Sequence, residues 1–253
     1  MDKVVVFADH NIGYLLVDYL YDNQNDFIIE RIYTNNNEQA WWKKVIENEK
    51  FSGKVMLYDP DLTIRDVMRL MPEYLLLLSW KHIIPESLIT SVKKKVVNLH
   101  YSLLPDHRGV YPINNAIMSG DKVTGVTYHV VNKGIDSGDV IAQQKTEIKW
   151  TDDVSTLLER LDVIAFDLFK KIWPIRDKWS EMQKPQIETR SYNSLKRFEH
   201  SNCIDLTKSY QASELINLLR SKMFKEQTSS FFIDEKSDEK FVVKIQIEKV
   251  ELL

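Results

Sequence analysis

The sequence contains little cysteine, no long apolar run and no strong charge of either sign. Cys203 is the only cysteine among 253 residues, which excludes an intramolecular disulfide and a multi-cysteine metal site; we interpret it as a buried or idle thiol. No stretch of about 18 apolar residues occurs, so no membrane span is predicted. The formal net charge is −3, which argues against a whole-protein field that would attract nucleic acid or an anionic membrane.

Two further signals are missing. The N-terminal residues lack the long apolar segment of a signal peptide, and with the single cysteine this favours a reducing, cytoplasmic location. Glycine is scarce, and the first turn, Phe7 to Gly13, has no GxGxxG pattern, so a dinucleotide is not indicated. What remains is an ordinary globular composition, 43% hydrophobic and 28% charged, long enough for one large domain or a medium domain with an appendage.

The first hundred residues alternate between apolar runs and amphipathic segments. We expect strands at 4–8, 27–33, 54–57, 74–79 and 96–100, with helices at 14–21, 38–49 and 63–70. Strands that alternate with helices predict βαβ units and an α/β fold with a Rossmann-like, mostly parallel, doubly wound sheet. Such a sheet binds ligands at the carboxyl ends of its strands.

The pattern of the second half predicts the rest of the core and a small appendage. We expect a helix at 112–118, strands at 122–131 and 140–148, and a long helix that begins at Thr151 with Asp152 and Asp153 and ends or kinks at Pro174. The predicted organisation is a core over 1–177, a linker over 178–190 and a C-terminal α+β subdomain over 191–253. Within that subdomain we expect a helix at 212–223 and a β-hairpin of strands 229–233 and 240–247.

Three polar residues suggest chemistry without a metal. Asn98 and His100 are two apart near the end of a strand, so their side chains share one face. Asp136 lies in the turn-rich segment 132–139. A titratable group, a partner that orients it and an oxyanion donor are the parts that polar catalysis requires. The three residues can fill these roles.

The motifs around these residues resemble a known family. Residues 98–112 follow the pattern N-x-H-x-S-L-L-P-x-x-R-G-x-x-P, and G-I-D-x-G follows at 134–138. This is similar to the N10-formyltetrahydrofolate-dependent formyltransferases, best over 75–150. The resemblance implies that Asn98, His100 and Asp136 are catalytic: Asn98 and His100 stabilise an oxyanion while an amine attacks the formyl carbon, and Asp136 orients His100 and helps to remove the amine proton.

The resemblance also implies contacts with the folate co-substrate, N10-formyltetrahydrofolate. The matching positions lie in two segments, 79–84 and 135–140, where backbone groups and an apolar slot would hold the pterin. The candidate residues are Ser79, Trp80, Ile83, Ile84, Ile135, Asp139 and Val140. Trp80 has two interpretations that stay open here, contact with folate or packing on the core.

Candidate acceptor contacts come from a loop and from the C-terminal region. In the loop of His107, Arg108 and Gly109, either Gly109 serves a turn at positive φ or Arg108 lies near the acceptor. Further candidates for a sugar, a base or a diphosphate are Tyr111, Tyr192, Asn193 and Arg220. The remaining histidines His10, His82 and His200 are interpreted as surface or core residues, and His129 as a structural histidine.

The family has branches that act on methionyl-tRNA, glycinamide ribonucleotide and nucleotide-linked sugars. A core with a small C-terminal subdomain resembles the nucleotide-sugar branch, which implies a dTDP-linked 3- or 4-amino-dideoxy hexose, first of all dTDP-4-amino-4,6-dideoxyglucose, destined for a surface polysaccharide such as the O-antigen of lipopolysaccharide. Three alternatives remain. The chain could act on methionyl-tRNA or glycinamide ribonucleotide, it could be a formyltetrahydrofolate hydrolase, or it could be a non-catalytic sugar-nucleotide-binding protein. The apolar face of the hairpin predicts a homodimer.

Overall fold

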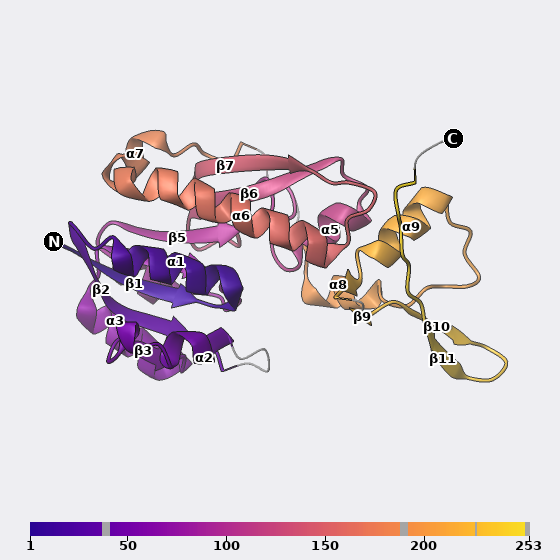
Figure 1. The fold of residues 1–253 in the computed structure, drawn as a ribbon, viewed down its shortest axis with the longest axis horizontal. Helices are drawn as coiled ribbons and strands as arrows, with labels where there is room; N and C mark the ends of the chain where they lie inside the picture. Colours follow the sequence, from indigo (N-terminus) through magenta and orange to yellow (C-terminus); the bar gives the residue numbers. More distant parts are fainter. Residues whose placement is uncertain (37–40, 188–191, 226, 251–253) are drawn as a thin grey trace. The chain divides into compact units, whose positions relative to one another are not determined.

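The computed structural model describes residues 1–36, 41–187, 192–225 and 227–250. Within those ranges the central sheet has seven strands in the order β3-β2-β1-β4-β5-β6-β7 (Figure 1). Its strands are β1 (Asp2–Ala8), β2 (Phe27–Thr34), β3 (Val55–Leu57), β4 (Tyr74–Leu78), β5 (Lys95–His100), β6 (Val123–Val130) and β7 (Val140–Glu147). The fold is therefore the predicted α/β type, with a mostly parallel, Rossmann-like sheet.

The centre of the sheet is parallel and buried. β1 pairs in parallel with β2 and β4, and β4 pairs in parallel with β5, whereas β6 runs antiparallel to β5. All five residues of β4 are buried, as expected of a parallel strand that is covered on both faces. The chain builds outward from β1 through β2 to β3, then crosses to β4 and β5. The carboxyl ends of β1 and β4 consequently flank the point where the strand order reverses.

Helices α1 (His10–Asp22), α2 (Trp41–Ile46), α3 (Pro60–Leu70) and α4 (Glu86–Ser91) connect these strands. Helix α1 begins at His10, earlier than predicted, because the Asp9 side chain accepts a hydrogen bond from the His10 amide and caps the helix there. The helix predicted over 38–49 is shorter, since α2 ends at Ile46 and a 3-10 turn follows at Glu49–Phe51. Positions 38–40 of that prediction lie outside the described residues.

The second half contains α5 (Pro112–Met118), α6 (Val154–Ile172), a 3-10 segment at Trp173–Lys178 and α7 (Trp179–Met182). Helix α6 begins after Asp153, whose carboxylate accepts from the Thr156 amide at 2.8 Å; Thr151 and Asp152 precede the helix instead of forming its first turn. The end of α6 at Ile172 confirms the effect predicted for Pro174. Helix α7 occupies the start of the predicted linker.

The C-terminal region contains α8 (Leu195–His200), α9 (Ala212–Arg220), β8 (Met223–Phe224), β9 (Gln227–Thr228), β10 (Phe231–Asp234) and β11 (Glu239–Val242). The antiparallel pair β10–β11 confirms the predicted hairpin, but the prediction of a strand as far as 247 is wrong, because 243–250 form no strand in the described chain. Helix α9 also ends earlier than predicted, since Met223 begins β8. Of the two interpretations of Cys203, a buried thiol is wrong because the residue is exposed, and an idle thiol stays a prediction.

The chain divides into two compact units. The first contains Met1–His100, Thr127–Gln143 and Ala165–Ile187; the second contains Tyr101–Val126, Gln144–Ile164 and the residues from 188 onward. Across the described residues, no helix is long and apolar enough to span a bilayer. The candidate catalytic residues belong to the first unit, and the candidate acceptor residues belong to the second.

Candidate active site

Four polar side chains meet where β5 and β6 lie beside the turn that follows β6. His100 Nδ1 lies 3.6 Å from Asp136 Oδ2, and Asn98 Nδ2 lies 3.4 Å from Asp136 Oδ1. His129 Nε2 lies 3.1 Å from Asn98 Nδ2 and 3.5 Å from Asp136 Oδ1. His100 is 6% exposed and His129 2%, so water has little access to either imidazole. The structure brings the three predicted residues together and adds His129.

Strand register explains the meeting. Asn98 and His100 are alternate residues of β5 and therefore share a face of the sheet. In the antiparallel pair of β5 and β6, Asn98 lies opposite His129, and directly opposed residues project to the same face. The pairing of β5 with β6 thus places the His129 side chain next to that of Asn98.

The turn that carries Asp136 has an unusual backbone. Asp136 adopts φ 46°, in the left-handed region that few residues other than glycine visit. Gly138 runs so close to β6 that a Cβ there would lie 1.8 Å from the Val130 carbonyl oxygen, so only glycine fits. Asn132 organises the start of the turn, since its Oδ1 accepts from the Gly134 amide at 2.9 Å and from Ser137 Oγ at 2.8 Å. The G-I-D-x-G sequence therefore serves to present the Asp136 carboxylate.

His129 sets the orientation of the Asn98 amide. His129 Nδ1 lies 3.0 Å from the Val130 carbonyl, which can only accept, so Nδ1 carries a proton. In the tautomer that carries its proton on Nδ1, Nε2 accepts from the NH2 group of Asn98, whose Nδ2 lies 3.1 Å away. The Asn98 Nδ2 atom also donates toward Asp136 Oδ1, at 3.4 Å.

This arrangement suits transfer of an acyl-type group to an amine. Asn98 offers an N–H donor for a developing oxyanion, His100 can hold or give a proton, and Asp136 can orient His100 and accept one. Among the described residues, no group of three or more His, Cys, Asp or Glu side chains is arranged to hold a metal ion.

We interpreted His129 as a structural histidine, which its burial and its hydrogen bonds support, but sequence reasoning did not predict its contact with Asn98. The only signal available was its place in an extended apolar run. The pairing of β5 with β6 decides which residue faces Asn98, and a single sequence does not specify that register.

The first candidate folate segment follows β4. Trp80 packs against Phe7 and Tyr58 with ring centroids 5.0 Å apart in each case, which favours the core interpretation of this side chain. Ile84 is buried, whereas Ile83 is 79% exposed. Ser79 has φ 61° and its Oγ lies 3.0 Å from His10 Nδ1. Of these residues, Ile83 is an exposed apolar side chain and stays a predicted folate contact.

The second candidate folate segment is the turn before β7. Ile135 is 40% exposed and offers another apolar surface. The Asp139 carboxylate accepts from Gln183 Nε2 at 2.9 Å. The amide and carbonyl of Val140 both bond to Lys184, at 2.8 and 2.9 Å, so the main chain of Val140 is already paired. The exposed Ile135 stays a predicted folate contact, whereas the Val140 amide already donates to Lys184 and is not available to a pterin.

Candidate acceptor residues cluster around the loop that precedes α5. Gly109 has φ 88° and forms an isolated bridge with Asn193; a Cβ at Gly109 would lie 2.4 Å from the Asn193 carbonyl oxygen. This confirms the turn interpretation of Gly109. Arg108 is buried, and its carbonyl accepts from the Asn193 amide at 2.8 Å. His107 Nε2 lies 2.6 Å from Asp121 Oδ2.

An aromatic stack adjoins this loop. Tyr111 stacks on Phe198 with ring centroids 4.2 Å apart and remains 45% exposed, and Tyr192 is 53% exposed. Lys222 is buried, and its Nζ lies 3.3 Å from the centroid of the Phe198 ring. The same Nζ donates a hydrogen bond to Ser201 Oγ at 2.6 Å. Burial lowers the pKa of Lys222 to about 8. The stack thus joins an exposed ring to a buried cation.

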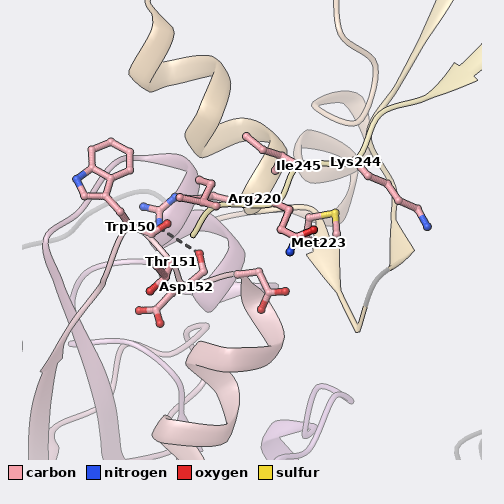
Figure 2. Close-up of a pocket in the computed structure, with 10 residues that line it drawn as sticks. Trp150, Thr151, Asp152, Arg220, Met223, Lys244 and Ile245 are labelled. Carbon is pink, nitrogen blue, oxygen red and sulfur yellow. Dashed lines mark hydrogen bonds between the residues drawn. The ribbon is translucent and has the colours of Figure 1, made fainter. Parts of the chain in front are cut away.

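Arg220 lies in a different setting from the one we predicted. Its Nη1 donates to the carbonyls of Lys149 at 2.7 Å and Asp152 at 3.1 Å, and its Nε donates to Asn217 Oδ1 at 3.0 Å. Burial lowers the pKa of Arg220. Figure 2 shows Arg220 beside Trp150, with Ile245 nearby, at a cavity of about 600 Å³ that none of the three predicted catalytic residues lines. Arg220 therefore links α9 to the segment before α6 within the second unit.

Comparison with known families matches two parts of the chain. Residues 32–169 match the family described as formyl transferase, and residues 198–249 match the N-formyltransferase dimerization C-terminal domain. Among curated proteins, the methionyl-tRNA formyltransferase of Latilactobacillus sakei is 32% identical over 180 residues, which are 70% of this chain and 53% of that protein. The chain thus spans about half the length of that relative.

Solved structures match over nearly the whole chain. A 4-N formyltransferase from Francisella tularensis has a TM-score of 0.83 at 24% identity, covering 98% of this chain and 99% of that one. An N-formyltransferase from Helicobacter canadensis, in complex with folinic acid and dTDP-3-aminofucose, has a TM-score of 0.66 at 20% identity, covering 89% and 82%. At these identities the likeness concerns the fold.

Proposed function

Because the chain belongs to the formyl transferase family, we propose that it moves the formyl group of N10-formyltetrahydrofolate to the amino group of a dTDP-linked amino-dideoxy hexose, with dTDP-4-amino-4,6-dideoxyglucose as the first candidate. The observation that carries this proposal is the cluster of Asn98, His100 and Asp136. The side-chain nitrogens Asn98 Nδ2 and His100 Nδ1 lie 3.4 and 3.6 Å from the Asp136 carboxylate oxygens. These are the groups that the reaction requires. The surface-polysaccharide pathway and the cytoplasmic location remain predictions.

Each side chain has a distinct task in the proposed mechanism. Formyltetrahydrofolate would supply the formyl carbon. As the C–N bond to the amine forms, Asn98 donates an N–H to the formyl oxygen and stabilises its negative charge. His100, oriented by Asp136, takes part in the same stabilisation and relays the amine proton to N10 of the departing folate. The products are the formamido sugar and tetrahydrofolate, so atoms and protons balance.

The C-terminal region supports a nucleotide sugar as the acceptor. Its match to the N-formyltransferase dimerization domain supports this branch, as do the solved sugar N-formyltransferases that match along almost the whole chain. The exposed rings of Tyr111 and Tyr192 are suited to a base or sugar. We assign His107, Arg108, Gly109 and Asn193 to the loop that supports this surface. The match to a dimerization domain also supports a homodimer.

Methionyl-tRNA is the second candidate, because curated methionyl-tRNA formyltransferases are about 30% identical to the chain. Purified protein would be incubated with N10-formyltetrahydrofolate and, separately, dTDP- and UDP-linked 3- and 4-amino sugars, methionyl-tRNA, glycinamide ribonucleotide or no acceptor. We expect mass spectrometry to detect a formamido product with a dTDP-amino sugar and no turnover without acceptor. Formylation of methionyl-tRNA alone would transfer the assignment to that branch, and turnover without acceptor would indicate a hydrolase.

A further inference from the structure

The segment after α7 runs along the turn that carries Asp136. The backbones of Lys184 and Val140 exchange two hydrogen bonds of 2.8 and 2.9 Å. Gln183 Nε2 donates to Asp139, while Gln183 Oε1 accepts from Lys95 Nζ at 2.7 Å, which ties the segment to β5. Gln183 and Lys184 lie outside both matched family ranges, 32–169 and 198–249. A segment between the two ranges therefore contacts the candidate catalytic turn.

Gln186 makes the closest link to that turn. Its Nε2 donates to the Asp136 carbonyl at 3.0 Å and to the Gly138 carbonyl at 2.7 Å. A primary amide has two N–H groups, so one side chain can hold both carbonyls at once. These carbonyls belong to the peptide units that follow Asp136 and Gly138, so the bonds restrain the backbone on both sides of Ser137.

Restraint of the backbone also restrains the carboxylate. The carbonyl and the side chain of Asp136 share one Cα, so a fixed carbonyl limits the direction of the Cα–Cβ bond. Asp136 needs this support, because its φ of 46° is a conformation that persists in non-glycine residues when the surroundings hold it. The Asp136 carboxylate lies only 3.4–3.6 Å from Asn98, His100 and His129, and a small rotation of the turn would separate it from all three.

From these contacts we infer that Gln186 is a positioning residue for formyl transfer: its side-chain amide holds the 136–138 turn so that the Asp136 carboxylate meets His100 and Asn98. The inference rests on the catalytic role proposed for Asp136. The segment between the two family matches would then support catalysis as well as connect the two matched ranges.

The first test measures the restraint itself and needs no acceptor. Hydrogen–deuterium exchange of the full chain would compare Gln186→Ala and Gln186→Glu, whose carboxylate cannot donate, with the matched control Lys184→Ala, which keeps its backbone bonds. We expect severalfold faster exchange of the peptide over 132–140 in both Gln186 variants, with β4 unchanged. Unchanged exchange in that peptide would overturn the inference.

The second test measures the catalytic consequence. Gln186→Ala should lower kcat by on the order of tenfold to a hundredfold, because small misplacements of a reacting group are costly, while KM stays within about twofold. In an Asp136→Asn background the same change should lower kcat no further. Full kcat in Gln186→Ala, or an equal loss in both backgrounds, would contradict positioning through Asp136. If the wild-type protein formylates none of the amines, the proposed function fails, and the exchange measurement still decides whether Gln186 restrains the turn.

Discussion

The candidate catalytic cluster in the first unit differs from Tyr111 and Tyr192, the exposed candidate acceptor residues of the second, in how its side chains are held. His100 and His129 are almost fully buried and lie within hydrogen-bonding or ion-pair distance of Asn98 or Asp136. Tyr111 and Tyr192, by contrast, are about half exposed. Chemistry shared by a family needs a fixed geometry, whereas recognition of the acceptor needs open surface. We therefore expect substitutions in the cluster to lower kcat and substitutions of the exposed rings to raise KM.

The largest effect should follow Asp136→Asn. Loss of the carboxylate removes the group that orients His100 and accepts a proton, so kcat should fall by roughly 10²- to 10⁴-fold. Steady-state kinetics with formyltetrahydrofolate and the amino sugar would measure it, with a thermal melt to verify folding. A variant that folds and keeps more than half of the wild-type kcat would remove Asp136 from the mechanism.

A smaller loss is expected for His129→Phe. Without the acceptor at Nε2 the Asn98 amide is free to turn, so kcat should fall by roughly tenfold to a hundredfold, less than for loss of an oxyanion donor. KM should change little. The exposed His200→Gln is the matched control and should keep wild-type kinetics. If His129→Phe is fully active, the orientation of Asn98 does not depend on His129.

The exposed ring of Tyr111 provides the opposite half of the comparison. Tyr111→Ala removes the surface proposed to stack on the nucleotide base, which contributes about 1–3 kcal/mol per stacked base, so KM for the nucleotide sugar should rise by about fivefold to a hundredfold. Tyr111→Phe keeps the ring and should keep KM within about twofold. A fall in kcat at constant KM in Tyr111→Ala would show that the division between the two units is wrong.

The smallest expected effect concerns stability in the second unit. Since the folded-state pKa of Lys222 is about 8 and the ordinary value is 10.5, the unfolded chain binds a proton that the native chain lacks between these pH values. The free energy of unfolding should therefore gain a contribution as pH rises from about 8 to 10.5, and lose it as pH falls through 8.

Chemical denaturation across that range would compare wild type with Lys222→Met and with the exposed control Lys196→Met. Only Lys222→Met should show a smaller rise of stability with pH than the wild type, whatever its stability at neutral pH. An identical pH dependence in Lys222→Met and the wild type would show that burial does not perturb Lys222.

Local sequence patterns predicted most of the fold. The apolar run at β4, the alternation of strands and helices, and Pro112 and Pro174 at helix boundaries act over short stretches of chain, so their physical effects are visible in a single sequence. The strand predicted beyond Val242 failed because an alternating pattern needs a neighbouring strand to pair with, and the pattern alone does not supply one.

The candidate site was predicted only as far as its motifs extend. Asn98, His100 and Asp136 belong to two short motifs, whereas the contact of His129 with Asn98 depends on strand register and that of Gln186 with Asp136 spans 50 positions. Arg220 shows the reverse case. A cation that looked available to a diphosphate is buried against backbone carbonyls, which its sequence neighbourhood does not reveal.

The central claim is tested most directly by one competition experiment. The purified chain would receive N10-formyltetrahydrofolate with equal concentrations of dTDP-4-amino-4,6-dideoxyglucose and methionyl-tRNA, and the formylated products would be quantified by mass spectrometry. The account predicts a formamido sugar nucleotide that accumulates with turnover, forms roughly 10²- to 10⁴-fold more slowly in Asp136→Asn, and leaves the tRNA unformylated. Formyl-methionyl-tRNA as the product, with the sugar nucleotide unchanged, would contradict it.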